Sequence, residues 1–242
     1  MSLEIRNKIK ELIETEITLE EDAHKYILAS DKKKVFKNCT DIVDENFEPF
    51  NKKRIAKKLV RRFPKYRHYT VKGLIAEWDA SRDRGTLIHT ELQRYIENGE
   101  EPTTERGHFG VAWFVDAINL DGVESFCEVI VFDEDLGIAG TVDLLTYNSK
   151  SGECNIYDWK TSKVIDREGY RGKTGITNAT YDLQDCRFIK YSLQTTLYKY
   201  MLEKSFDIPI EGMYLIHLDA FSADLISAQH LRTHVKQIIS TL

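Results

Sequence analysis

Hydrophobic residues recur at three- and four-residue spacing over several stretches of the chain, which is the periodicity of an amphipathic helix. The pattern predicts helices over residues 1–14, 51–62, 71–98, 105–120 and 183–204, and from about residue 223 to the C-terminus. Pro64 is expected to stop the second helix, whereas Gly85 is expected to interrupt the third and Gly99 to end it. Thr40 is expected to cap a further short helix.

Runs of β-branched and aromatic residues predict the strands. Residues 24–39 predict a hairpin around a polar turn at 31–34, and residues 213–218 predict a strand near the C-terminus. Residues 126–132, 138–147 and 154–160 predict a three-stranded antiparallel meander, with a polar turn between the last two strands. Helices before and after such strands indicate an α/β (α+β) fold, in which a central mixed sheet is flanked by helices and accompanied by the N-terminal hairpin.

Composition limits the classes of protein that fit this pattern. The 242 residues are 42% hydrophobic and 30% charged, values typical of a globular protein. The sequence contains no repeat and no Gly/Ser-rich linker, so residues 1–70 are expected to pack, as a helical and hairpin region, on a core formed by residues 71–242. The net charge of −5 excludes a protein that is basic throughout, so any affinity for nucleic acid must come from a local patch.

Cysteine spacing and the N-terminus bear on cofactors and compartment. Cys39, Cys127, Cys154 and Cys186 include no CxxC pair, which argues against a zinc or iron–sulfur motif. The N-terminus lacks an apolar signal core, and no apolar run approaches the roughly 20 residues that span a bilayer. We therefore expect an intracellular protein, cytoplasmic or nucleoid-associated, with no membrane partner. An organelle-targeting peptide that had been removed would leave no trace in this sequence.

Two neighbouring predicted strands carry the residues with candidate chemistry. Asp143 lies on one strand, and Asp158 and Lys160 lie two residues apart on the next, so their side chains share a face. Carboxylates hold Mg²⁺ or Mn²⁺, and such an ion polarises a phosphoryl oxygen and activates water. A lysine can orient or help deprotonate that water, or stabilise the charge that develops on phosphate. This combination suits phosphodiester cleavage, although an isolated D-x-K pattern is common on ordinary surface hairpins.

Four motifs in a fixed order carry a resemblance to a known family. Gly140 to Asp143 forms G-x-x-D, and Asp158 to Lys160 forms D-x-K. Upstream, Gly85 to His89 forms G-x-x-x-H, and downstream Gln194 to Tyr198 forms Q-x-x-x-Y. Together they resemble the PD-(D/E)XK nuclease superfamily, in particular its RecB-like branch. The run over 158–162 is similar to mitochondrial genome maintenance exonucleases and to related phage and archaeal exonucleases. The resemblance covers about residues 73–218.

The resemblance implies a restriction-endonuclease-like core over residues 71–242 and a metal-dependent DNA exonuclease that acts on single strands or DNA ends in replication, repair or recombination. The implied cofactor is Mg²⁺ or Mn²⁺, without an iron–sulfur cluster, because no cysteine group follows the Q-x-x-x-Y motif. The implied partners are DNA and a separate helicase or replication and recombination proteins. Two alternatives stay open: a structure-selective endonuclease of the same superfamily, and an inactive DNA-binding module of a helicase or replication complex.

Roles in the site follow from the same resemblance, motif by motif. The implied metal ligands are His89, Asp143, Asp158 and the backbone carbonyl of Trp159. Lys160 matches the catalytic lysine, and Gln194 and Tyr198 match a pair that positions DNA and the lysine; their i, i+4 spacing puts both on one helix face. Glu128, in the strand before Asp143, is expected to be an additional ligand or a nearby acid, or else a solvated strand residue.

A basic segment predicts the path of DNA. Residues 51–67 contain nine Lys or Arg residues and no acid, which suits salt-dependent contacts with phosphates; the alternative is a solvated helix face. Phe63, Tyr66 and Tyr69 are candidates to stack on bases, or else belong to the core. The glycine-spaced loop 162–182 is expected to be a mobile lid or strand guide, or else a plain connection. The expected DNA contacts are Lys52, Lys53, Arg54, Lys57, Lys58, Arg61, Arg62, Lys163 and Arg171.

Overall fold

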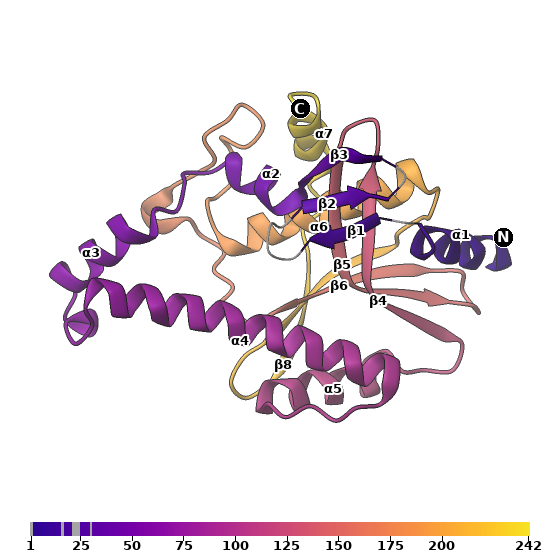
Figure 1. The fold of residues 1–242 in the computed structure, drawn as a ribbon, viewed down its shortest axis with the longest axis horizontal. Coiled ribbons are helices and arrows are strands. Elements are labelled where there is room, and N and C mark those ends of the chain that lie inside the picture. Colours follow the sequence, from indigo (N-terminus) through magenta and orange to yellow (C-terminus); the bar gives the residue numbers. More distant parts are fainter. Residues whose placement is uncertain (1, 16, 21–24, 30) are drawn as a thin grey trace.

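A mixed eight-stranded sheet with helices on both faces forms the computed structural model, which describes residues 2–15, 17–20, 25–29 and 31–242 (Figure 1). β5 occupies a central position, because it pairs antiparallel with β4 and β6 and parallel, over two residues, with β3. β7 pairs parallel with β6 and antiparallel with β8. The strands are β1 Ile17–Glu20, β2 Lys25–Leu28, β3 Asp31–Asn38, β4 Val123–Asp133, β5 Ile138–Asn148, β6 Cys154–Lys160, β7 Gly212–Leu218 and β8 Ala223–Ser227.

The helices cover the two faces of this sheet unequally. α1, α2, α6 and α7 contribute to a large core on one face, and α4 and α5 to a smaller core on the other. α3 and the first half of α4 project to one side of the body (Figure 1). The helices are α1 Ser2–Ile13, α2 Cys39–Glu45, α3 Lys52–Arg62, α4 Val71–Asn98, α5 Glu105–Ala117, α6 Arg187–Ser205 and α7 Arg232–Ile239, with short 3₁₀ helices η2 Pro64–Tyr66 and η3 Tyr170–Gly172.

The predicted mixed sheet with flanking helices is confirmed, and so is the antiparallel meander, now β4, β5 and β6. The N-terminal residues share the large core with the rest of the chain: Ile9 of α1 and Phe36 of β3 are buried in the same cluster as Leu197 of α6. None of the helices among the described residues is long and apolar enough to cross a membrane.

Helix α4 corrects one prediction, because it runs through Gly85 without interruption. A Cβ atom at Gly85 would lie 2.9 Å from the Thr161 side-chain oxygen, so this glycine permits close packing and does not break the helix. Gly99 ends α4 with a left-handed φ of 74°, as predicted. α5 ends three residues before the predicted position, and α6 begins at Arg187, because residues 183–186 form a turn.

Three further predictions are wrong in detail. Leu28 pairs with Asp31, so the hairpin turns before the polar run at 31–34, which lies within β3; His24, the predicted start of the hairpin, lies outside the described residues. Asn38 caps α2 by accepting from the Thr40 backbone N–H, so Thr40 is inside the helix. The C-terminal tail begins with strand β8, because pairing with β7 overrides its helical pattern. Strand β1 has no counterpart in the sequence-based prediction.

Candidate metal centre

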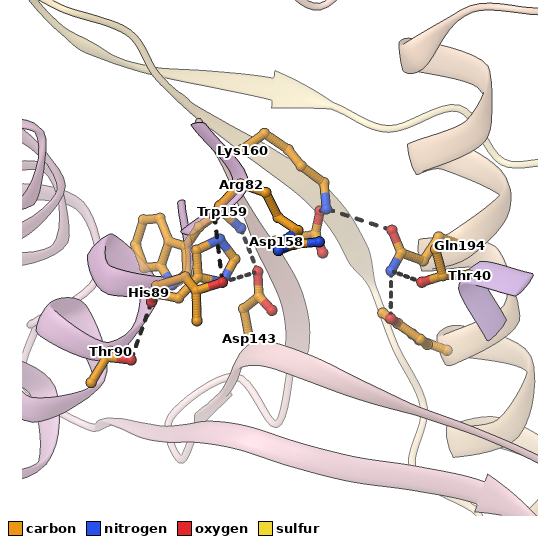
Figure 2. A network of polar contacts seen from close by, with 11 residues as sticks. Thr40, Arg82, His89, Thr90, Asp143, Asp158, Trp159, Lys160 and Gln194 are labelled. Atoms are coloured by element: carbon orange, nitrogen blue, oxygen red, sulfur yellow. Dashed lines mark hydrogen bonds and ion pairs between the residues drawn. The ribbon is translucent and has the colours of Figure 1, made fainter. Parts of the chain in front are cut away.

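The backbone of β6 and a side chain of β5 meet at the centre of the site. Asp143 Oδ2 accepts a hydrogen bond of 2.7 Å from the Trp159 backbone N–H and lies 3.5 Å from Nδ1 of His89. Figure 2 shows His89 on a helix on one side of Asp143, with Asp158, Lys160 and Gln194 on the other. The structure thus brings the predicted histidine of α4 to the predicted acid of the sheet.

A third ligating side chain joins this pair. One ligand atom from each of His89, Glu128 and Asp143 lies within 4.8 Å of the other two. Among the described residues, these three side chains form a group that could hold a metal ion. Glu128 has a positive φ of 49°, and the β4–β5 pairing is interrupted opposite it, between the pairs at Cys127 and Val129. The register on either side puts Asp143 opposite Glu128, so the two acids are cross-strand neighbours. Glu128 therefore belongs with the candidate ligands.

Asp158, a predicted metal ligand, forms an ion pair with Lys160. The ion pair joins Asp158 Oδ2 to Lys160 Nζ, and the two side chains are only 3% and 14% exposed. Asp158 and Lys160 share a face of β6, as the strand alternation predicted. The ligating group described above does not include Asp158, whose role as a ligand stays a prediction. Trp159 lines the same cleft, and its carbonyl remains a predicted ligand.

Helix α6 supplies the other contacts of Lys160. The Lys160 ammonium donates to Gln194 Oε1 at 3.5 Å and lies 4.4 Å from the ring centroid of Tyr191. Gln194 Nε2 in turn donates to the Tyr198 hydroxyl at 2.7 Å and to Thr40 Oγ1 at 3.2 Å. The two motif residues of α6 therefore form one chain of hydrogen bonds that ends on the lysine (Figure 2).

The charges of the site are strongly coupled. Burial and the charge of Asp143 raise the pKa of Glu128 to about 8. Burial also raises the pKa of Asp158 to about 6, although Lys160 opposes this. Burial disfavours the charge on Asp143, but His89 and the Trp159 N–H hold the pKa of that carboxyl below its usual value. Carboxylates this crowded favour the approach of a positive charge.

Two glycines of the motifs have a packing explanation. A Cβ at Gly140 would lie 2.4 Å from a ring carbon of Tyr198 and 3.2 Å from Cys39 Sγ. The ring of Tyr198 can therefore pack closely against β5 at this position only because residue 140 has no side chain. Gly85, in contact with Thr161, has the same role between α4 and the end of β6.

The site opens into a cleft of about 830 Å³. Helix α4 contributes Trp78, Arg82 and His89 to its lining, the sheet contributes Glu128 and Lys160, and α6 contributes Tyr191. Leu19 of β1 lies on the same lining, so the N-terminal region forms part of the wall. The cleft is large enough for part of a polymeric substrate and leads directly to the charged cluster.

The predicted DNA-contacting residues lie away from this cluster, on α3 and the 162–186 loop. Lys52 is held in an ion pair with Asp79 at 2.5 Å, and Arg54 in one with Glu48 at 3.1 Å. Arg54, Lys57, Lys58, Arg61 and Arg62 surround a hollow of about 450 Å³. Lys53, Lys163 and Arg171 are exposed.

The segment 162–182, predicted to be a mobile lid or strand guide or else a plain connection, lies in the loop 162–186 that precedes α6. Ile176 N–H donates to the carbonyl of Asn46 at 2.9 Å, Thr180 Oγ1 donates to the same carbonyl at 3.0 Å, and Thr174 pairs with Gln184 as a bridge. Thr180 is fully buried. These contacts join the loop to the C-terminal end of α2.

Tyr191, Thr40 and Arg82 were not identified as site residues from the sequence. A signal existed for two of them. Tyr191 lies three residues before Gln194 and Arg82 seven before His89, so each shares a helix face with a motif residue. Thr40 gave no such signal, because its contact with Gln194 joins residues 154 positions apart.

A scan against models of known protein families gave no match, and a search of curated proteins gave no significant match. What the site does is therefore inferred from its geometry and from the ordered motifs of the sequence.

Proposed function

We propose that the chain is a metal-dependent nuclease that hydrolyses phosphodiester bonds in DNA, acting as an exonuclease on single strands or DNA ends. The observation that carries this proposal is the convergence of His89, Glu128 and Asp143 beside the buried Asp158–Lys160 pair, at a cleft lined by His89, Glu128 and Lys160. The motif resemblance to RecB-like nucleases supports the same reaction.

The donor set fits a hard divalent cation. Two carboxylates and an imidazole are ligands that Mg²⁺ and Mn²⁺ accept, and donors around one such ion lie roughly 3 to 4 Å apart. The 4.8 Å limit within which the three ligand atoms lie is close to that spacing. His89, Glu128 and Asp143 would hold the ion, together with the predicted Trp159 carbonyl. When bound, it would polarise the phosphoryl oxygen and lower the pKa of a coordinated water.

Lys160 acts in this proposal as a charged donor. A carboxylate, an amide oxygen and a ring face surround its ammonium, and each favours the protonated form. Burial would lower the pKa of Lys160, but the charges of Asp158 and Asp143 outweigh it and raise that pKa above its usual value. An ammonium in this position stabilises negative charge that develops on the phosphate. Gln194 and Tyr198 keep it in place.

Cleavage of end-labelled oligonucleotides tests the proposal. Wild-type protein should degrade single-stranded or duplex DNA with Mg²⁺ or Mn²⁺ and not with excess EDTA. Lys160→Ala should lower the rate about 100- to 1,000-fold, the range for loss of one group that stabilises developing charge. Lys150→Ala is the matched control, because Lys150 lies in an exposed turn and pairs only with Asp121 among the contacts described. It should cleave at the wild-type rate.

The label also distinguishes the modes of action. Progressive shortening from one end indicates an exonuclease, and internal fragments indicate an endonuclease of the same superfamily. Undiminished cleavage by the Lys160 variant would contradict the assigned role of the lysine. If the wild-type protein binds DNA but cleaves no substrate, the nuclease proposal would be rejected in favour of the DNA-binding module.

A further inference from the structure

A second concavity beside the catalytic cleft combines aromatic rings with cations. It has a volume of about 780 Å³ and lies between residues 48–50, α3, η2 and the 162–186 loop. We call it the α3 groove. Its aromatic lining consists of Phe50, Phe63, Tyr66 and Tyr170, and its charged lining of Arg54, Lys58, Lys173, Lys190, Glu48 and Asp185.

The aromatic side chains of the α3 groove are unusually accessible. Phe50 is 62% exposed, Tyr170 57% and Phe63 39%. Single exposed apolar side chains are ordinary, but several that line one concavity form a patch that marks a binding surface. Their ring faces are available to a ligand that stacks.

Cations surround the same rings. Lys58, on α3, has its Nζ atom 5.8 Å from the ring centroid of Tyr170, which lies in the 162–186 loop. The hollow of five cations on α3 adjoins the groove, since Arg54 and Lys58 line both. Among the described residues, Lys57, Arg61 and Arg62 have no carboxylate partner within ion-pair distance. Their charges are therefore available to an anionic ligand.

Contacts join the two walls of the groove to each other and to the end of α2. Lys173 of the loop forms an ion pair with Glu48 of the opposite wall, and the loop is hydrogen-bonded to Asn46. A ligand that enters between such walls does not have to order them, which lowers the entropic cost of binding.

A pair of rings joins the groove to the catalytic cleft. The ring centroids of Phe50 and Trp78 lie 5.6 Å apart. Phe50 lines the groove and Trp78 lines the cleft. A ligand that occupies both concavities would therefore pass over a continuous row of aromatic side chains.

We propose that the α3 groove binds unpaired bases of a single nucleic-acid strand, and that this strand continues past Phe50 and Trp78 into the catalytic cleft. Stacking of bases on aromatic rings beside a basic helix is how proteins hold single strands. An acidic peptide would use the cations but not the ring faces, and a duplex already stacks its bases on one another. The continuation into the cleft rests on the proposed nuclease function, whereas the binding of the strand does not.

Binding in excess EDTA tests the groove separately from cleavage. Fluorescence anisotropy of a labelled 12-nucleotide oligothymidine and of a 12-base-pair duplex would be measured with wild type, Phe50→Ala, Tyr170→Ala and Leu120→Ala. Leu120 is the matched control, because it is a large apolar side chain that is 56% exposed and lies just before β4. Each aromatic variant should bind the single strand roughly 5- to 100-fold more weakly, the range for loss of one stacking ring. Duplex binding should change less than twofold, as should all binding by the control.

Conservative variants complete the test. Phe50→Tyr and Tyr170→Phe should keep wild-type affinity because they keep a ring. With metal present, the alanine variants should raise KM on long strands and leave kcat unchanged, since Phe50 and Tyr170 line the groove and not the cleft that contains Lys160. Single-strand affinity no weaker than that of the Leu120 control, or equal losses on both DNA forms, would overturn the groove. If the aromatic variants lose single-strand binding but the wild-type protein cleaves no substrate, the proposed binding role of the groove would stand and the proposed nuclease function would be rejected.

Discussion

Replacing Tyr191 by leucine tests how the lysine of the candidate site is held. Lys160 Nζ lies 4.4 Å from the ring centroid of Tyr191, within the distance at which a ring attracts a cation, and the lysine side chain is only 14% exposed. A desolvated cation–π contact contributes about 2 kcal/mol, and the ammonium keeps Asp158 and Gln194 in the variant. Tyr191→Leu should therefore lower kcat by roughly 10- to 30-fold, with KM for DNA little changed.

Tyr191→Phe is the matched control, because it keeps the ring and removes only the hydroxyl. It should retain kcat within about twofold if the ring face is what matters. Steady-state cleavage of a labelled oligonucleotide gives kcat and KM, and thermal unfolding shows whether each variant is folded. A loss of kcat as large in the phenylalanine variant as in the leucine variant would refute this reasoning, as would full activity of Tyr191→Leu in folded protein.

Two further predictions concern the metal ligands and stability. Glu128→Gln should weaken Mn²⁺ binding, measured by calorimetry without DNA, by roughly tenfold or more, whereas the exposed Glu153→Gln should not change it; equal affinities would remove Glu128 from the ligands. Glu91, which is 7% exposed, accepts backbone and side-chain hydrogen bonds from Thr103 and Thr104, and these hold its pKa below the usual value against the opposing effect of burial. Glu91→Ala should cost about 3 kcal/mol in urea unfolding at pH 7. Because the pKa of Glu91 is lower in the folded state than its unfolded-state value of about 4.3, the carboxylate contributes stability above that pH, and this contribution is lost as pH falls through the folded-state pKa. The difference in unfolding free energy between wild type and Glu91→Ala should therefore shrink below about pH 4; a difference that stays constant with pH would contradict this.

Local periodicity predicted the parts of the fold and site that depend on neighbouring residues. The alternation along a strand correctly put Asp158 and Lys160 on one face, and i, i+4 spacing correctly joined Gln194 to Tyr198. Gly99 ends α4, as its residue type predicts. These inferences need only the geometry of a single strand or helix.

Features that depend on distant contacts were not accessible in the same way. Glu128 joins the ligating group because the β4–β5 register puts it opposite Asp143, and the hydrophobic pattern of a single strand does not fix that register. The tail at β8 becomes a strand because β7 offers it an edge. Gly85 looked like a helix break because its packing partner, Thr161, lies 76 positions away in the sequence. In each case a tertiary contact decides between local alternatives of similar energy.

The distribution of charge gives the proposed strand path a direction. Helix α3 contributes seven cations to a chain whose net charge is −5, so the remaining residues together are more negative than the whole. Salt screens exposed charges beyond about 8 Å at physiological ionic strength, so a polyanion responds to α3 locally and not to the net charge. Helix α3 projects from the body (Figure 1), and the aromatic pair Phe50 and Trp78 joins the groove beside this helix to the cleft. In the proposal, a strand captured at α3 would therefore follow a route to Lys160 that is lined by ring faces and basic side chains. In the proposed function, capture and cleavage are separate tasks of separate surfaces, so variants of the groove should change KM and variants of the lysine should change kcat.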